Sequence, residues 1–169
     1  MVTLWGNYEG ISQCQIWVNL LRHLLIKLVM LSVGFLSAGD ILANTPEQVI
    51  TAFQRDYKYW NDQSFQRNQN YGKQEVMLLA QKGWNELLNK YTKPGFQGEP
   101  IAFGSESSHD PEQENIISVH ISEKVATVTT RLSRQYYSPV YEYQLSKEND
   151  TWYLSQIFLV DDDGKYPSL

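Results

Sequence analysis

Most of the fold information in this 169-residue chain lies in three segments: KVATVTTRLS (residues 124–133), YSPVYEYQLSK (137–147) and TWYLSQIFLV (151–160). Each segment is rich in β-branched or aromatic residues, whose side chains fit a pleated sheet. Just upstream, residues 117–122 alternate between aliphatic and polar side chains, which is the period of a strand. Together these segments predict an antiparallel meander of four or five strands.

The connections between the expected strands are short and polar. Residues 123–124 (EK) and 148–150 (END) have turn composition and lie at hairpin separations. The run DDDGK at 161–165 resembles the start of a calcium loop, but it lacks the alternating ligand spacing and the closing glutamate. We therefore interpret this run as a turn that leaves the preceding strand.

Two helices are expected before the strands. Residues 45–48 (TPEQ) match a helix start, with a capping threonine, a proline at the first helical position and a capping-box glutamine. Apolar residues then recur at helical spacing until the Asn-Asp pair at 61–62, where we expect this helix to end. A polar connection leads to a second helix over residues 73–91, which the prolines and glycines of residues 92–100 terminate.

Two helices followed by an antiparallel meander predict an α+β domain. Helices lying across one face of a curved sheet would form a cone with an open end, a common place for a pocket. The alternation along the last two long segments predicts which side chains line the concave face: Tyr141, Tyr143, Leu145, Trp152, Leu154, Gln156 and Phe158.

The first 43 residues differ from the rest. Residues 24–38 form an apolar core behind a basic flank and before a small-residue exit, which is typical of a secretory signal with cleavage after Ala38 or Ala43. We expect translation to begin near Leu25 or Met30 and the mature domain to span residues 44–169, in the periplasm. The protein would contact the membrane only through this signal segment, before cleavage removes it. The alternatives are a cytoplasmic protein, or an uncleaved N-terminal helix that packs on the domain or anchors in a membrane.

Composition narrows the classes of partner. The net charge is −5 and no lysine or arginine cluster occurs, whereas nucleic-acid binding needs a basic footprint, so no nucleic acid is expected. The single cysteine, Cys14, lies in the N-terminal segment. A mature chain from Asn44 would contain no thiol, which excludes disulfides, zinc–thiolate sites and cysteine nucleophiles from it.

Residues 102–120, AFGSESSHDPEQENIISVH, contain the side-chain types of a metal or acid–base site: His109, Asp110, Glu112, Glu114 and His120. The composition is nevertheless that of a loop, and we interpret its acids as solvated and His120 as a surface residue. Glu142 falls on the face opposite Tyr141 and Tyr143, so no acid–base pair is evident on the concave face. Catalytic residues, cofactors and metals are therefore not expected.

Several short motifs follow one another in order over residues 46–166. Each is weakly specific by itself, and their order and spacing carry the likeness. They are Phe53 with Trp60-Asn61, Phe103-Gly104-Ser105, Asp110-Pro111-Glu112, Ile116-Ile117, Val128-Thr129-Thr130, Tyr141-Glu142-Tyr143 with Leu145, and Trp152 before the closing DDDGKY.

This set resembles the immunity proteins with a nuclear transport factor 2-like fold that accompany bacterial polymorphic toxins. The resemblance implies a non-enzymatic inhibitor that binds one cognate toxin, and it supplies no binding residues of its own. The alternative is a pocket protein of the same fold class, either a small-ligand binder or an isomerase-like or cyclase-like enzyme. A homodimer through the sheet is a further expectation.

Two acidic loops are the candidate contacts with such a toxin. Many bacterial toxin domains are basic, and acids at the rim of an interface steer a basic partner during association. The candidate toxin-binding residues are Glu106, Asp110, Glu112, Glu114, Asp161, Asp162 and Asp163.

Overall fold

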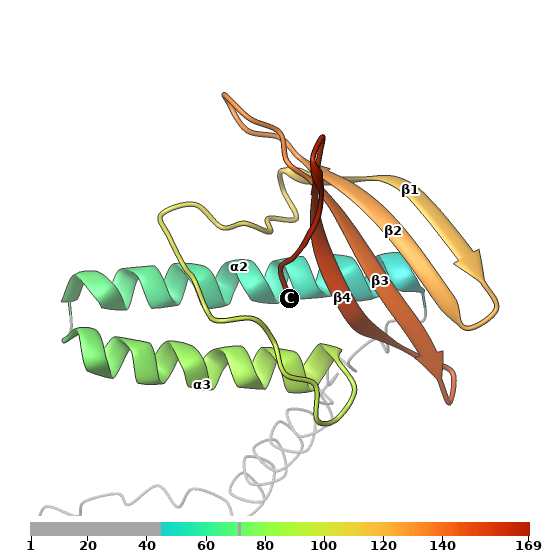
Figure 1. Ribbon diagram of the computed structural model, residues 1–169. Helices are drawn as coiled ribbons and strands as arrows, with labels where there is room; N and C mark the ends of the chain where they lie inside the picture. Colours follow the sequence, from blue (N-terminus) through green and yellow to red (C-terminus); the bar gives the residue numbers. More distant parts are fainter. Residues whose placement is uncertain (1–44, 71) are drawn as a thin grey trace, which may run out of the picture. The chain divides into compact units, whose positions relative to one another are not determined.

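The computed structural model describes residues 45–70 and 72–169, so the expected signal segment, residues 1–43, lies outside the described residues. Two helices precede five strands (Figure 1). Their bounds are α2 Pro46–Asn70, α3 Lys73–Tyr91, β1 Glu114–Ser122, β2 Val125–Leu132, β3 Val140–Glu148, β4 Thr151–Asp161 and β5 Gly164–Pro167. The strands form one sheet in the order β1-β2-β3-β4-β5, and each neighbouring pair is antiparallel. The expected α+β domain, with two helices packed against an antiparallel meander, is confirmed.

Helix α2 begins as expected and ends later than expected. The backbone N–H of Gln48 donates to the Thr45 hydroxyl oxygen at 3.3 Å, and the Thr45 N–H donates to Gln48 Oε1 at 3.2 Å, which confirms the capping box. The prediction that the helix ends at residues 61–62 is wrong, because α2 continues to Asn70. In the part of the chain that the structure describes, neither helix has the length and apolar character needed to cross a bilayer.

A tertiary contact explains the longer helix. The Asn61 side chain is buried; its Nδ2 donates to the backbone oxygen of Gly104 at 3.0 Å, and its Oδ1 accepts from the Gly104 N–H at 3.0 Å. Asparagine disfavours helix interiors because its side chain competes for nearby backbone groups. Here that side chain bonds a loop far along the chain and the Asp62 carboxylate, so it does not compete for the helix backbone.

Helices α2 and α3 pack through a close aromatic contact. Trp60 Nε1 donates to the carbonyl oxygen of Ala80 at 2.9 Å, and the Trp60 ring lies 5.1 Å from the Trp84 ring. The contact requires a glycine at position 83, because a β-carbon there would lie 2.9 Å from Trp60 Cδ1. The second helix spans Lys73–Tyr91, which confirms its predicted bounds.

The hairpin turns also match the expectation. Residues 123–124 join β1 to β2, and residues 149–150 join β3 to β4. Glu123, Asn149 and Asp150 have positive φ angles of 50°, 47° and 65°, as two-residue hairpin turns require.

The expected concave face is confirmed for β3 and only for the first part of β4. Tyr141, Tyr143 and Leu145 of β3 are buried, as are Trp152 and Leu154 of β4, where Leu154 pairs with Leu145. Together with apolar residues of the two helices they form the core, whose helical part is Val49, Ile50, Phe53, Tyr57, Trp60, Trp84, Leu87, Leu88 and Tyr91.

A β-bulge in β4 overturns the rest of that expectation. Ser155 is an extra residue without a partner in β3, where the register changes between Gln144 and Leu145. Beyond the bulge, Ile157 takes the buried position, whereas Gln156 and Phe158 turn to the opposite face. The prediction that Gln156 and Phe158 line the concave face is therefore wrong, because one inserted residue reverses the alternation.

Candidate functional site

One end of the sheet gathers three segments that are far apart in the sequence. The end of loop 102–113 leads into β1, loop 133–139 joins β2 to β3, and residues 162–163 form the turn after β4. The strand register brings these connections to the same end (Figure 1). The two acidic segments identified in the sequence therefore share one end of the sheet.

An open hollow of about 800 Å³ lies between the two loops and helix α2. Lys58, Asp62 and Phe65 contribute from α2, and loop 102–113 contributes serines and acids. Arg134, Tyr136 and Tyr137 contribute from loop 133–139. The lining is thus polar and aromatic, with charges of both signs.

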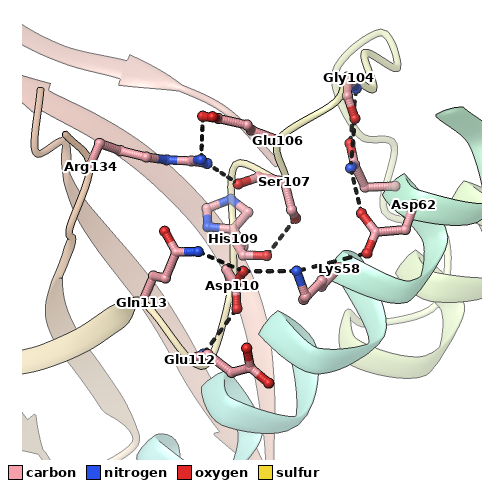
Figure 2. A network of polar contacts seen from close by, with 11 residues as sticks. Lys58, Asp62, Gly104, Glu106, Ser107, His109, Asp110, Glu112, Gln113 and Arg134 are labelled. Atoms are coloured by element: carbon pink, nitrogen blue, oxygen red, sulfur yellow. Dashed lines mark hydrogen bonds and ion pairs between the residues drawn. The ribbon is translucent and has the colours of Figure 1, made fainter. Parts of the chain in front are cut away.

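Ion pairs fix the rim of the hollow (Figure 2). Lys58 Nζ lies 2.8 Å from Asp110 Oδ2, which ties loop 102–113 to helix α2. Asp110 Oδ1 also accepts from the Glu112 N–H at 3.0 Å, an arrangement that closes a tight turn. Across the hollow, Arg134 pairs with the Glu106 carboxylate and donates to the backbone oxygen of Ser107. The cations at the rim are therefore already neutralised by loop carboxylates.

The Lys58–Asp110 pair shifts the pKa of both groups. Burial alone would raise the pKa of Asp110, but the Lys58 hydrogen bond, the Glu112 N–H and the Lys58 charge outweigh it and hold the pKa below its usual value. The Asp110 hydrogen bond raises the pKa of Lys58. Both directions keep the pair ionised.

A second polar cluster lies behind the hollow and inside the core. The Tyr143 hydroxyl donates to Glu114 Oε1 at 2.7 Å and lies 2.8 Å from His109 Nδ1. That same nitrogen lies 3.2 Å from Glu114 Oε2, and the Thr130 hydroxyl also donates to Glu114. Since the tyrosine proton points to the glutamate, the facing histidine nitrogen carries a hydrogen. Glu114 thus accepts from three different segments.

This cluster settles the ionisation of its members. Burial would raise the pKa of Glu114, but the hydrogen bonds and charge of His109, with the hydroxyls of Thr130 and Tyr143, bring it below the usual value. Burial and the neighbouring Glu114 charge raise the pKa of Tyr143 well above its usual value. The glutamate is therefore ionised and the tyrosine neutral over a wide pH range.

The interpretation of the acids in this stretch as solvated is wrong for two of them, and His109 is buried beside them. The side chains of His109 and Glu114 are 2% and 0% exposed, and Asp110 is buried as well. The contact between His109 and Glu114 was not evident from the sequence. Their burial nevertheless keeps a substrate away from both groups in this conformation. Neither His109 nor Glu114 lines the hollow, whereas Tyr141 does, and the centre of its ring lies 4.6 Å from that of the His109 ring.

The remaining predicted residues lie at the surface. Glu106 and Glu112 are exposed, and so are Asp161, Asp162 and Asp163. Asp161 Oδ1 accepts from the N–H groups of Asp163 at 2.9 Å and Gly164 at 3.0 Å, so this carboxylate shapes the turn. Within residues 45–70 and 72–169, no group of acidic, histidine or cysteine side chains has a metal-binding arrangement. His120 is exposed on β1, which confirms the prediction that it is a surface residue.

Sequence reasoning missed the aromatic residues of loop 133–139. Tyr136 is 91% exposed and Tyr137 is 59% exposed, and both follow the rim residue Arg134 after one intervening glutamine. The available signal was two adjacent tyrosines beside Ser138-Pro139, a composition that favours a loop over a strand.

No protein-family model, curated protein or solved structure matches this chain.

Proposed function

We propose that this chain is an immunity protein with a nuclear transport factor 2-like fold, which binds one cognate bacterial toxin and neutralises it without catalysis. Two kinds of support lead to this proposal. The ordered motifs over residues 46–166 resemble that family, and two helices against a five-stranded antiparallel sheet are compatible with its cone-like fold. The periplasm is the proposed location, which mass spectrometry of a mature N-terminus near Gly39 or Asn44 would test.

The observation that carries the proposal is the exposed aromatic loop beside the acidic rim. Tyrosine and arginine are enriched at the energetic centres of protein interfaces, where an aromatic ring buries a large area at a small entropic cost. Tyr136, Tyr137 and Arg134 have this composition, and they lie on a loop held by an ion pair to Glu106. Such a loop suits the docking of a protein partner.

The acids of the proposed contact surface are the exposed ones. Glu106, Glu112 and residues 161–163 lie around the same end of the sheet. Asp110 and Glu114 are buried and hold the loop in place, so we assign them no direct contact with a toxin. The surface then combines aromatic anchors with acidic steering groups for a basic partner.

A binding experiment tests the proposal. The gene immediately upstream is the first place to look, because a large modular toxin there supplies the partner. Surface plasmon resonance with its toxic domain should give a specific complex, and the double change Tyr136→Ala and Tyr137→Ala should weaken it by at least about tenfold, the loss expected of hot-spot aromatics. Tyr59→Ala is the matched control, since Tyr59 is 69% exposed on helix α2 and does not line the hollow. Equal effects of both changes would contradict the proposed surface.

A small-ligand binder is the second candidate, because the hollow has the volume of ligand pockets. A metabolic operon around the gene, together with thermal stabilisation by a metabolite of that operon, would favour this candidate over the toxin inhibitor. The same ligand should then lose its effect in Arg134→Ala, since this cation lines the hollow.

A further inference from the structure

Strand β1 is an edge strand that lacks most of the features by which proteins usually prevent pairing with another chain. It is the outermost strand of the sheet, and within the described residues it pairs with β2 alone. Residues 115–122 are all exposed and contain neither a charged side chain nor a proline. Natural edge strands usually carry such residues to prevent pairing with another chain. The one protective feature is a β-bulge between Ile116 and Ser118, which leaves residues 118–122 in regular one-to-one pairing with β2.

The regular part of this edge is complementary to itself. Its sequence is Ser118-Val119-His120-Ile121-Ser122. In an antiparallel pairing of two copies centred on His120, Ser118 faces Ser122 and Val119 faces Ile121. Every residue then meets one of its own kind, and no charged residue is placed opposite another.

The side chains on the two faces also match in this pairing. Val119 and Ile121 lie opposite Val128 and Ala126, which are buried, so both belong to the core face of the sheet. They are nevertheless 37% and 50% exposed, because no further strand covers them on the outer side of β1 among the described residues. A second copy would bring two such aliphatic strips together and remove apolar surface from water, which favours association.

We propose that β1 is a homodimer interface, in which the β1 strands of two copies pair antiparallel about a two-fold axis at His120. The two five-stranded sheets then form one continuous sheet. An isologous contact of this kind closes on itself and does not propagate into fibres. The homodimer interface uses the free edge of the sheet, whereas the proposed toxin surface uses the loops at one end. Each proposal can therefore be tested independently of the other.

Cysteine cross-linking tests the register. In the full chain with Cys14→Ser, the variant His120→Cys places the two introduced thiols opposite each other, at the separation of neighbouring strands that suits a disulfide. Under mild oxidation it should form covalent dimers. Ser122→Cys alone should not, because it faces Ser118 of the other copy, whereas Ser118→Cys combined with Ser122→Cys should cross-link. Cross-linking of Ser122→Cys alone with none for His120→Cys would overturn the proposed register.

The oligomeric state tests the interface without cysteines. Light scattering during size exclusion should give the wild-type chain a concentration-dependent mass approaching twice that of one copy. His120→Asp should shift it to the single-copy mass, because two carboxylates would face each other across the strands. Ser155→Asp, at an exposed position of β4, adds the same charge away from β1 and should leave the dimer intact. A single cooperative thermal unfolding transition of His120→Asp would show that the domain remains folded.

Two results would overturn the homodimer. One is a single-copy mass for the wild-type chain at all concentrations up to about 100 µM, since the dissociation constant of any dimer would then lie above that concentration. The other is His120→Cys cross-linking to the toxic domain in preference to itself, which would assign the β1 edge to the toxin.

Discussion

Glu114 carries a negative charge into the core of this domain, and its surroundings explain how it is tolerated. A buried charge is costly unless partners replace the lost hydration. His109, Thr130 and Tyr143 provide these partners from a loop and two different strands. The carboxylate therefore joins loop 102–113 to the sheet, directly beneath the hollow.

The first prediction concerns the removal of this acceptor. Glu114→Ala should destabilise the fold by about 3–5 kcal/mol, because three buried donors lose their partner. Glu112→Ala, two residues earlier and exposed, should change the free energy of unfolding by less than about 0.5 kcal/mol. Urea unfolding of both variants at neutral pH measures the difference. Similar losses would mean that the cluster around Glu114 does not support the loop.

The second prediction concerns acid. The pKa of Asp110 and of Glu114 is lower in the folded protein than the usual values of 3.8 and 4.5, so the unfolded chain takes up protons first as the pH falls. Their stabilising contribution is present above about pH 4.5 and is lost as the pH falls through the folded pKa values. Urea midpoints measured between neutral pH and about pH 3 should fall, and Asp110→Asn should reduce the slope. An unchanged slope in this variant would contradict the assignment.

Helices α2 and α3 approach closely because Gly83 leaves room for the Trp60 ring. The indole N–H of Trp60 reaches the Ala80 carbonyl, one turn before Gly83 on the same helix. Glycine inside a helix normally costs stability relative to alanine. At this position the cost is offset by the packing of a buried tryptophan.

The third prediction follows from that contact. Gly83→Ala should destabilise the domain by about 1–3 kcal/mol through overpacking, although alanine is the better helix former. In a Trp60→Phe background the same change should cost less or become stabilising, since the atom nearest the new β-carbon belongs to the indole ring. Thermal unfolding of the four proteins in this cycle measures the coupling. Additive effects would show that Trp60 does not limit the space at position 83.

The arrangement of the whole domain brings two acidic segments together that are separated by some fifty residues in the sequence. An odd number of connections lies between them in an up-and-down meander, and the strand register places both at one end of the sheet. Exposed charges at a common end produce a combined field, which steers a basic partner during its approach. This effect depends on the fold and not on any one acid.

The fourth prediction rests on the proposed function. Changing Asp161, Asp162 and Asp163 to asparagine should slow association with the toxic domain and flatten its salt dependence, with less effect on dissociation. The turn should persist, because asparagine keeps the side-chain oxygen that accepts from residues 163 and 164. Surface plasmon resonance at two salt concentrations measures both rates. Unchanged association here and in a Glu106→Gln, Glu112→Gln variant would contradict steering by these acids.

Local patterns in the sequence were sufficient for much of the fold. The capping box at residues 45–48, the bounds of α3 and the hairpin turns after β1 and β3 all follow from neighbouring residues. Such features depend on interactions within a few positions, for which residue type and spacing carry the information. The α+β class followed from the same signals.

Contacts between distant segments account for what the sequence did not reveal. Asn61 remains helical because Gly104 uses its side chain, and one extra residue at Ser155 exchanges the faces of Ile157 and Phe158. Two acids that lie two positions apart have different environments: Glu112 is exposed to solvent, while Glu114 is buried and accepts a hydrogen bond from Tyr143, 29 positions away. A carboxylate is buried only where donors from elsewhere in the chain compensate its lost hydration, and the position of those donors is a property of the folded chain.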